Sequence, residues 1–109
     1  MERFVSGDII VVPYPTFDFK STKKRPAVVL ATSLQGVVVC PITTKQFKGV
    51  NTIAILKSDL KAGKLRDISY AIPEWISTFQ YSYILYKAGS LHSQKLAEIL
   101  NSVSKLFSK

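Results

Sequence analysis

Two short groups of polar residues have the side chains needed to handle a phosphate, and each group borders an apolar segment. Lys23–Arg25 directly precede a proline and an apolar run, and Thr43 and Thr44 close a second apolar run. An arginine guanidinium offers a planar fork of donors that matches phosphate, and a threonine hydroxyl can hydrogen-bond a non-bridging oxygen. Solvated strand ends show the same pattern, so residue types alone leave both interpretations open.

Aromatic residues interleave with this basic stretch. Tyr14, Phe17 and Phe19 lie just before it, and Trp75 and Phe79 occur later. Unpaired RNA bases stack on exposed aromatic rings, so aromatic residues beside cations suit single-stranded RNA. The chain has one Trp, five Tyr and six Phe, twelve in all. Because most aromatic residues pack in cores, we expect one or two of them to contact RNA.

Other kinds of reactive site find little support. The chain has one His and one Cys, and it contains no glycine-rich phosphate loop and no HExxH motif. A zinc site, a P-loop and a Cys–His nucleophile pair are therefore not predicted, and no metal ligand is assigned. His92 stands where the C-terminal helix should begin, and we interpret it as a residue of the helix start.

The net charge favours a polyanionic partner. Fifteen Lys and Arg against seven Asp and Glu give 15 − 7 = +8 over 109 residues. Such a charge raises the local concentration of nucleic acid and speeds encounter with it. Solubility alone is the competing explanation.

Length and composition predict a single domain, 1–109, with its own core. Cys40 lies within the apolar run Gly36–Ile42, so we expect a buried thiol and a reducing compartment. No segment approaches the roughly 18 apolar residues of a membrane span. The expected location is cytoplasmic.

The candidate residues lie at the ends of predicted strands. Short Ile- and Val-rich runs predict strands at Asp8–Pro13, Ala27–Ala31, Val37–Ile42, Thr52–Leu56 and Ile68–Ile72, the last two pairing across the polar segment Lys57–Asp67. Pro13, Pro15 and Pro26 bracket a polar stretch that we predict to be a loop of about ten residues, because proline cannot supply a ladder donor. If the second and third strands are hairpin partners, Arg25 and Thr43 share one site.

The remainder of the chain completes a mainly β fold with one C-terminal α-helix. Trp75–Leu91 predicts one or two further strands, with Gly89 at a turn. Apolar residues then recur at helical spacing, at Leu96, Ile99, Leu100, Val103, Leu106 and Phe107. Short strands followed by one helix, without βαβ alternation, favour a small SH3-like barrel.

The order of the motifs is specific. A Gly-Asp-apolar strand ends in Pro13-Tyr14-Pro15, a loop leads to Lys24-Arg25-Pro26, and the next strand closes in Pro41-Ile42-Thr43. This arrangement resembles the PemK/MazF family of toxin endoribonucleases, which also fits the later Leu65–Tyr70 and Lys87–Leu91 segments and the amphipathic tail. The resemblance covers nearly the whole chain.

The resemblance implies a CcdB/PemK-like barrel that forms a homodimer, cuts single-stranded RNA without a metal or other cofactor, and is held inactive by an antitoxin with an acidic, disordered tail. It assigns Arg25 to transition-state charge stabilisation and Thr43 to orienting the scissile phosphate. The expected RNA-binding residues are Lys20, Lys23, Lys24, Phe17, Thr44, Lys45 and Gln80.

The chain departs from the family pattern at one place. Where some relatives carry Arg-Thr-apolar-Asp, this sequence has Ser77-Thr78-Phe79-Gln80. An amide cannot exchange a proton at neutral pH, so the general base is left open, and a non-catalytic relative that binds RNA or an antitoxin is the first alternative. A CcdB-like gyrase poison is the second, but the tail ends Ser-Lys-Leu-Phe-Ser-Lys, without the Trp-Gly-Ile-like end of those toxins. A structural SH3-like adaptor would explain neither motif.

Overall fold

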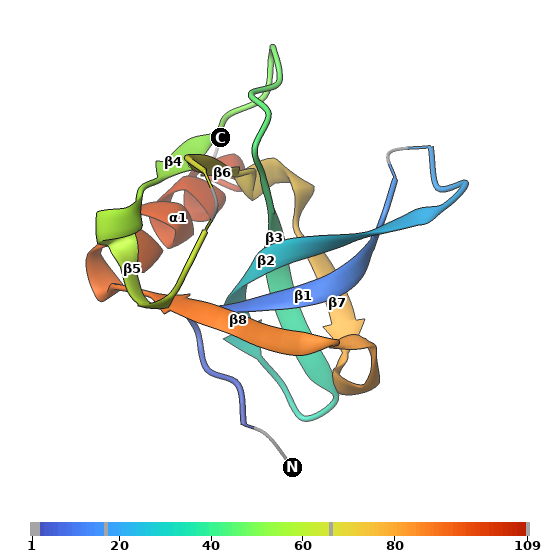
Figure 1. Cartoon of the computed structure of the whole chain (residues 1–109). Helices are drawn as coiled ribbons and strands as arrows, with labels where there is room; N and C mark the ends of the chain where they lie inside the picture. The colour runs from blue at the N-terminus through green and yellow to red at the C-terminus, as the bar shows by residue number, and fades with distance from the viewer. Residues whose placement is uncertain (1–2, 17, 66, 109) are drawn as a thin grey trace.

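The computed structural model describes residues 3–16, 18–65 and 67–108 (Figure 1). The strands are β1 (Asp8–Pro15), β2 (Thr22–Thr32), β3 (Gly36–Thr43), β4 (Ile53–Ile55), β5 (Leu60–Gly63), β6 (Ser69–Ala71), β7 (Ser77–Gln80) and β8 (Tyr86–Leu91). Single 3₁₀ turns are η1 (Lys57–Asp59), η2 (Pro73–Trp75) and η3 (Tyr81–Tyr83), and the α-helix is α1 (Ser93–Leu106).

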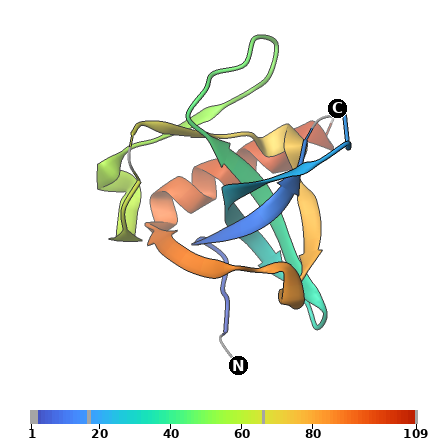
Figure 2. The ribbon, with the colours of Figure 1, turned by 45° about the vertical axis from the view of Figure 1, so that its right-hand side comes forward.

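The strands form one strongly curved sheet that nearly closes into a barrel. Its order is β4-β6-β3-β2-β1-β8-β5, and β7 pairs with β3 outside this path. The described pairings are antiparallel, and α1 packs against one side of the sheet (Figures 1 and 2). The predicted mainly β barrel with a C-terminal helix is confirmed.

Two apolar clusters lie on opposite faces of the central strands. Successive side chains of a strand point to opposite faces, so Ile9 joins the cluster that contains Ile99 of α1, while Ile10 and Val12 join the other. Strands covered on both faces read as continuous apolar runs, which explains the composition of β1 and β3. The candidate site described below continues the second cluster beyond Val12.

The basic stretch before Ala27 is strand, where we had predicted loop. β1 runs to Pro15 and β2 starts at Thr22, with Val12 opposite Arg25 and Tyr14 opposite Lys23. β1 pairs with β8 only as far as Val11, and β2 pairs with β3 only from Ala27. This end is therefore a two-stranded ribbon with a free edge on each strand. Proline is accepted at a free edge because no neighbouring strand requires its missing N–H donor.

Two other expectations are corrected. The segment Lys57–Asp67 is not a plain turn, because it contains η1 and β5. Gly89 lies inside β8 and not at a turn. Glycine is needed there because a Cβ would collide with the carbonyl oxygen of Ala62 on the neighbouring strand β5. The pairing of β4 with β6 is as predicted, and so are the helix start at His92 and the buried Cys40. Burial raises the pKa of the Cys40 thiol to about 12.

Asp8 fastens the start of β1. Its carboxylate accepts a hydrogen bond of 2.9 Å from the backbone N–H of Val5 and pairs with Lys87 of β8 at 3.2 Å. The Asp8 side chain is 3% exposed and that of Lys87 38% exposed, so water solvates only one partner freely. We expect Asp8→Ala to lower the free energy of unfolding by about 1–3 kcal/mol and Asp8→Asn to lower it less, because the amide keeps an acceptor for Val5. Urea denaturation of both variants measures this, and equal losses would contradict the role given to the Val5 bond.

Candidate functional site

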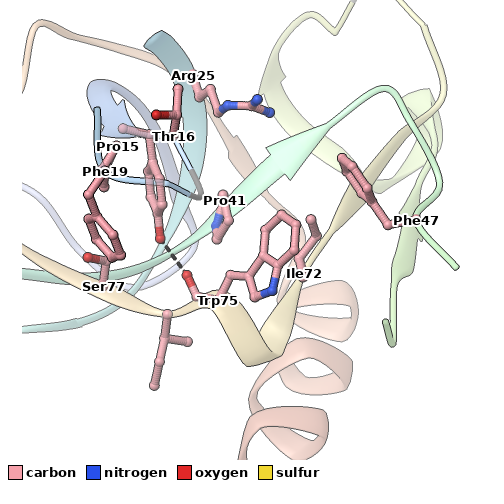
Figure 3. A pocket seen from close by; sticks show the side chains of 11 residues that line it. Pro15, Thr16, Phe19, Arg25, Pro41, Phe47, Ile72, Trp75 and Ser77 are labelled. Carbon is pink, nitrogen blue, oxygen red and sulfur yellow. Dashed lines mark hydrogen bonds between the residues drawn. The ribbon is translucent and has the colours of Figure 1, made fainter. Parts of the chain in front are cut away.

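A pocket of about 330 Å³ opens where the β1–β2 ribbon meets β3 and η2 (Figure 3). Its lining is mainly aromatic, proline and isoleucine side chains: Tyr14, Pro15, Thr16, Phe19, Arg25, Pro41, Phe47, Ile72, Trp75, Ile76 and Ser77. Figures 1 and 2 both show the ribbon and the segment 44–52 projecting from the same end of the barrel. The pocket lies between them.

Among the described residues that line the pocket, Arg25 is the one with a charged side chain. It is half-buried on β2, on the face that farther along carries the core residues Ala27 and Val29. Figure 3 shows its guanidinium extended above Pro41 toward the side of the pocket where Phe47 lies. Within the described part of the chain, the ion pairs of the structure do not involve Arg25. Its fork of donors therefore lies at the pocket without a carboxylate, among the described residues, to neutralise it.

Alternation along β2 separates the neighbouring lysines. Lys23 shares the Arg25 face, whereas Lys24 belongs to the other face of the ribbon. Both lysines are exposed. The sequence predicted one basic group, but the strand divides it, and Lys23 is the lysine on the pocket side.

Tyr14 connects the ribbon to the floor of the pocket. Its hydroxyl donates a hydrogen bond of 2.5 Å to the backbone carbonyl of Trp75, drawn as a dashed line in Figure 3. Burial raises the pKa of Tyr14 above its usual range. The phenol therefore stays neutral at physiological pH and acts as a structural donor that holds η2, not as a base.

Phe47 closes one side of the pocket, and sequence reasoning missed it. Its ring lies 5.2 Å from that of Trp75, centroid to centroid, at an interplanar angle of 54°. The segment that carries it is fastened to η2, because the Asn51 N–H donates to the Glu74 carboxylate at 3.1 Å. The exposed Lys45 and Lys48 lie in this segment, one on each side of Phe47 in the sequence. The sequence signal that could have identified Phe47 is an aromatic residue between lysines, the same signal that singled out Phe19.

The turn between β1 and β2 presents Phe19 on the opposite side of the pocket in the view of Figure 3. Phe19 has a φ of 60°, in the left-handed region, and its side chain is 82% exposed. The Asp18 carboxylate accepts hydrogen bonds from the Thr16 hydroxyl at 2.7 Å and from the Lys20 N–H at 3.0 Å. These bonds, the Thr16 hydroxyl foremost, lower the pKa of Asp18. The turn therefore exposes an aromatic ring on a residue whose backbone conformation is uncommon. Such conformations cluster at binding sites.

Thr43 lies close to the pocket lining but outside it. The β2–β3 ladder ends at Ala27 opposite Pro41, and β3 then pairs with β6, with Thr43 opposite Tyr70. Thr43 is 7% exposed, and its hydroxyl accepts a hydrogen bond of 3.2 Å from the N–H of Lys45. Pro41, two residues earlier on the same face of β3, does line the pocket. The sharing of one site by Arg25 and Thr43 stays a prediction.

The other predicted residues are spread more widely. Lys20, Thr44 and Lys45 are exposed in the two segments beside the pocket. Gln80 is exposed opposite Gly36, at the far end of β7 from Ser77, which lines the pocket. Phe17 lies outside the described residues. The structure thus brings Arg25, Phe19 and Ser77 together and leaves Gln80 apart.

The described residues lack a cluster of metal ligands and a membrane-spanning helix. No three residues among His, Cys, Asp and Glu gather closely enough to hold a metal ion. In the same ranges, no helix is long and apolar enough to cross a membrane.

Comparison with known proteins finds similarity to a sequence family and to solved structures. The model of the PemK-like, MazF-like toxins of type II toxin-antitoxin systems matches residues 6–107. The toxin MazF-mt6 of Mycobacterium tuberculosis is similar in structure, with a TM-score of 0.70 and 19% sequence identity, over 92% of this chain and 95% of that one. No protein with a curated description matches the sequence significantly.

Proposed function

Because the chain belongs to the PemK/MazF family of type II toxin-antitoxin toxins, we propose that it is an endoribonuclease that cuts single-stranded RNA without a metal. The observation that carries this proposal is the Arg25 guanidinium, half-buried, without a carboxylate partner in the described residues, and set at the rim of an aromatic pocket. A cation beside apolar ring surfaces suits a phosphate joined to a base.

RNA supplies its own nucleophile, the 2′-hydroxyl, whose attack forms a bond to phosphorus while the bond to the 5′-oxygen breaks. Charge then builds on the non-bridging oxygens, and a preorganised cation stabilises it most in a poorly hydrated place. We assign this role to Arg25. Thr43 would orient the phosphate by donating its O–H to a non-bridging oxygen, while its oxygen accepts from the Lys45 N–H.

Partners follow from the same site. The +8 charge suits both RNA and an acidic, disordered antitoxin tail that folds on binding. We propose that the tail competes with RNA for the basic surface around the pocket, that the toxin acts as a homodimer, and that it works in the cytoplasm, where messenger RNA is accessible.

A binding protein without nuclease activity is the second candidate. Among the described residues that line the pocket there is no His, Asp or Glu, and Gln80, which replaces the acid of some relatives, lies at the end of β7 away from the pocket. A ribonuclease assay in EDTA with end-mapping of the products separates the two. Cuts at fixed positions support the nuclease, and RNA binding without cleavage by the native chain would leave only the binding protein.

Lys23 should matter more than Lys24 for RNA binding. Lys23 shares a face with Arg25, and Lys24 points to the other side of the ribbon. We expect Lys23→Ala to weaken binding about 3- to 10-fold and to reduce the slope of log affinity against log salt by about 0.7, the contribution of one phosphate contact on a single strand. Lys24→Ala should change both less. Fluorescence anisotropy at several salt concentrations measures this, and equal effects of the two variants would contradict the assignment by strand face.

A further inference from the structure

The segment 44–52 is loosely packed. It leaves the sheet after β3 and returns to it at β4, and the structure assigns neither a helix nor a strand to it. Residues 44–49 are exposed, and both views show the segment projecting from the barrel (Figures 1 and 2). Segments with few buried contacts open locally at a low cost in free energy. The position of this one therefore depends on the contacts that fasten it.

The turn η2, beside the segment, is firmly held. Ile72 and Pro73, where the turn begins, are fully buried. The Ile72 N–H donates to the Pro41 carbonyl of β3 at 3.1 Å, and the Tyr14 hydroxyl of β1 donates to the Trp75 carbonyl. These bonds tie the turn to two strands of the sheet. A side chain that projects from η2 therefore starts from a fixed point.

Two contacts join the loose segment to the fixed turn. The Asn51 N–H donates to the Glu74 carboxylate at 3.1 Å, just before the segment rejoins the sheet at β4. Nearer to the middle of the segment, the Phe47 ring lies 5.2 Å from the Trp75 ring (Figure 3). Asn51 and Glu74 are both exposed, so water competes for this hydrogen bond. The bond is thus strong enough to bias the position of the segment and weak enough to open.

We propose that Glu74 is a positioning residue, which keeps the segment 44–52 closed, with Phe47 against Trp75, through its hydrogen bond to Asn51. Glu74 is not among the described residues that line the pocket. It acts through the segment, which carries Phe47 and the exposed Lys45 and Lys48. The effect on the reaction rests on the proposed function, whereas the closure of the segment involves no RNA.

Opening of the segment should change the affinity for RNA more than the chemical step. Arg25, to which we assign the chemistry, lies on β2 and is not moved with the segment. Lys45 and Lys48 do move with it, and contacts to flanking phosphates position the substrate. A segment that is loose before binding must also be ordered on binding, which costs affinity. Loss of the Glu74 bond should therefore raise KM and leave kcat unchanged.

Glu74→Ala and Glu74→Gln form a matched pair of variants. Both remove the same negative charge, and the effect of this charge on RNA binding is therefore common to them. Glutamine keeps a carbonyl oxygen that accepts from the Asn51 N–H, whereas alanine does not. The difference between the two variants thus measures the hydrogen bond. Its loss should shift the equilibrium of the segment toward the open form about 3- to 10-fold.

The first measurement is quenching of Trp75 fluorescence by acrylamide, without RNA. Trp75 is the sole tryptophan of the chain, and Phe47→Ala gives the quenching constant of a tryptophan that Phe47 no longer covers. We expect Glu74→Ala to move the constant from the native value toward that of Phe47→Ala, and Glu74→Gln to stay near the native value. The midpoint of urea denaturation should be the same for the pair, because Glu74 is exposed.

The second measurement is single-turnover cleavage of a single-stranded RNA over a range of protein concentrations. We expect the half-saturating concentration of Glu74→Ala to lie about 3- to 10-fold above that of Glu74→Gln, with the same maximal rate. If the native chain binds RNA without cutting it, fluorescence anisotropy gives the affinities of the pair, and the same ratio is expected.

Three outcomes would overturn the inference. The first is equal quenching in Glu74→Ala and Glu74→Gln, because the ring contact alone would then hold the segment. The second is equal affinity of the pair for RNA, which would remove the positioning role. The third is a lower maximal rate at unchanged affinity in Glu74→Ala. If RNA is cut but the pair does not differ, the proposed function stands and the inference fails. If the pair differs in quenching and in affinity but RNA is never cut, the inference stands and the nuclease does not.

Discussion

Replacing Arg25 by alanine is expected to reduce RNA cleavage about 100- to 1,000-fold while leaving the fold intact. Arg25 is half-buried at the rim of the pocket and forms no ion pair within the described residues, so its removal breaks no paired charge. The expected loss is that of one preorganised group facing the charge of the transition state. Single-turnover cleavage of a labelled RNA in EDTA measures the rate.

Two further variants define this effect. Arg25→Lys keeps the charge but loses the planar fork, so we expect a large part of the defect to persist. Lys61→Ala removes one exposed charge from β5, which lies away from the β1–β2 ribbon in both views, and should cleave normally (Figures 1 and 2). If Arg25→Ala cut RNA within a few-fold of the native rate, catalysis would have to be assigned elsewhere.

Gly36→Ala is expected to destabilise the protein by about 3 kcal/mol, the upper end of the range for overpacked sites. Gly36 starts β3 opposite Gln80, and a Cβ there would collide with the backbone carbonyl of Phe79. The obstacle is backbone, so relief requires β7 to move away from β3. Phe79 packs on the second core cluster, and its ring lies 5.4 Å from that of Tyr14. The change should therefore loosen the pocket as well.

Urea denaturation gives the loss of stability for Gly36→Ala, and RNA binding at low denaturant reports on the pocket. Gly49→Ala serves for comparison, because its φ is +75° but a Cβ there meets nothing within 4 Å. It should lose only the roughly 1 kcal/mol of an unfavourable backbone conformation. Equal losses for the two variants would show that the collision with Phe79 is relieved without disturbing β7.

Local sequence patterns predicted most of the elements and one half of the candidate site. Apolar runs of β-branched residues mark β1, β2 and β3 because both faces of these strands are covered, and helical spacing marks α1 because one stripe of it packs on the sheet. Arg25 was identified because guanidinium chemistry and the Pro26 boundary are both visible in the sequence. The prolines misled the prediction of the loop, because the sequence does not show that this end of the sheet has free edges.

Contacts between residues that are distant in the chain depend on the fold. Phe47 and Trp75 lie far apart in the chain and make contact because the segment 44–52 folds back onto η2, held there by Asn51 and Glu74. The position of Thr43 depends on β3 exchanging β2 for β6 as its neighbour after Pro41, and no local pattern specifies that exchange. Periodicity and short motifs are local, so the residues alone predicted the barrel and the family, and they made Arg25 a candidate. The aromatic pocket beside that arginine is formed by long-range packing, which only the folded chain defines.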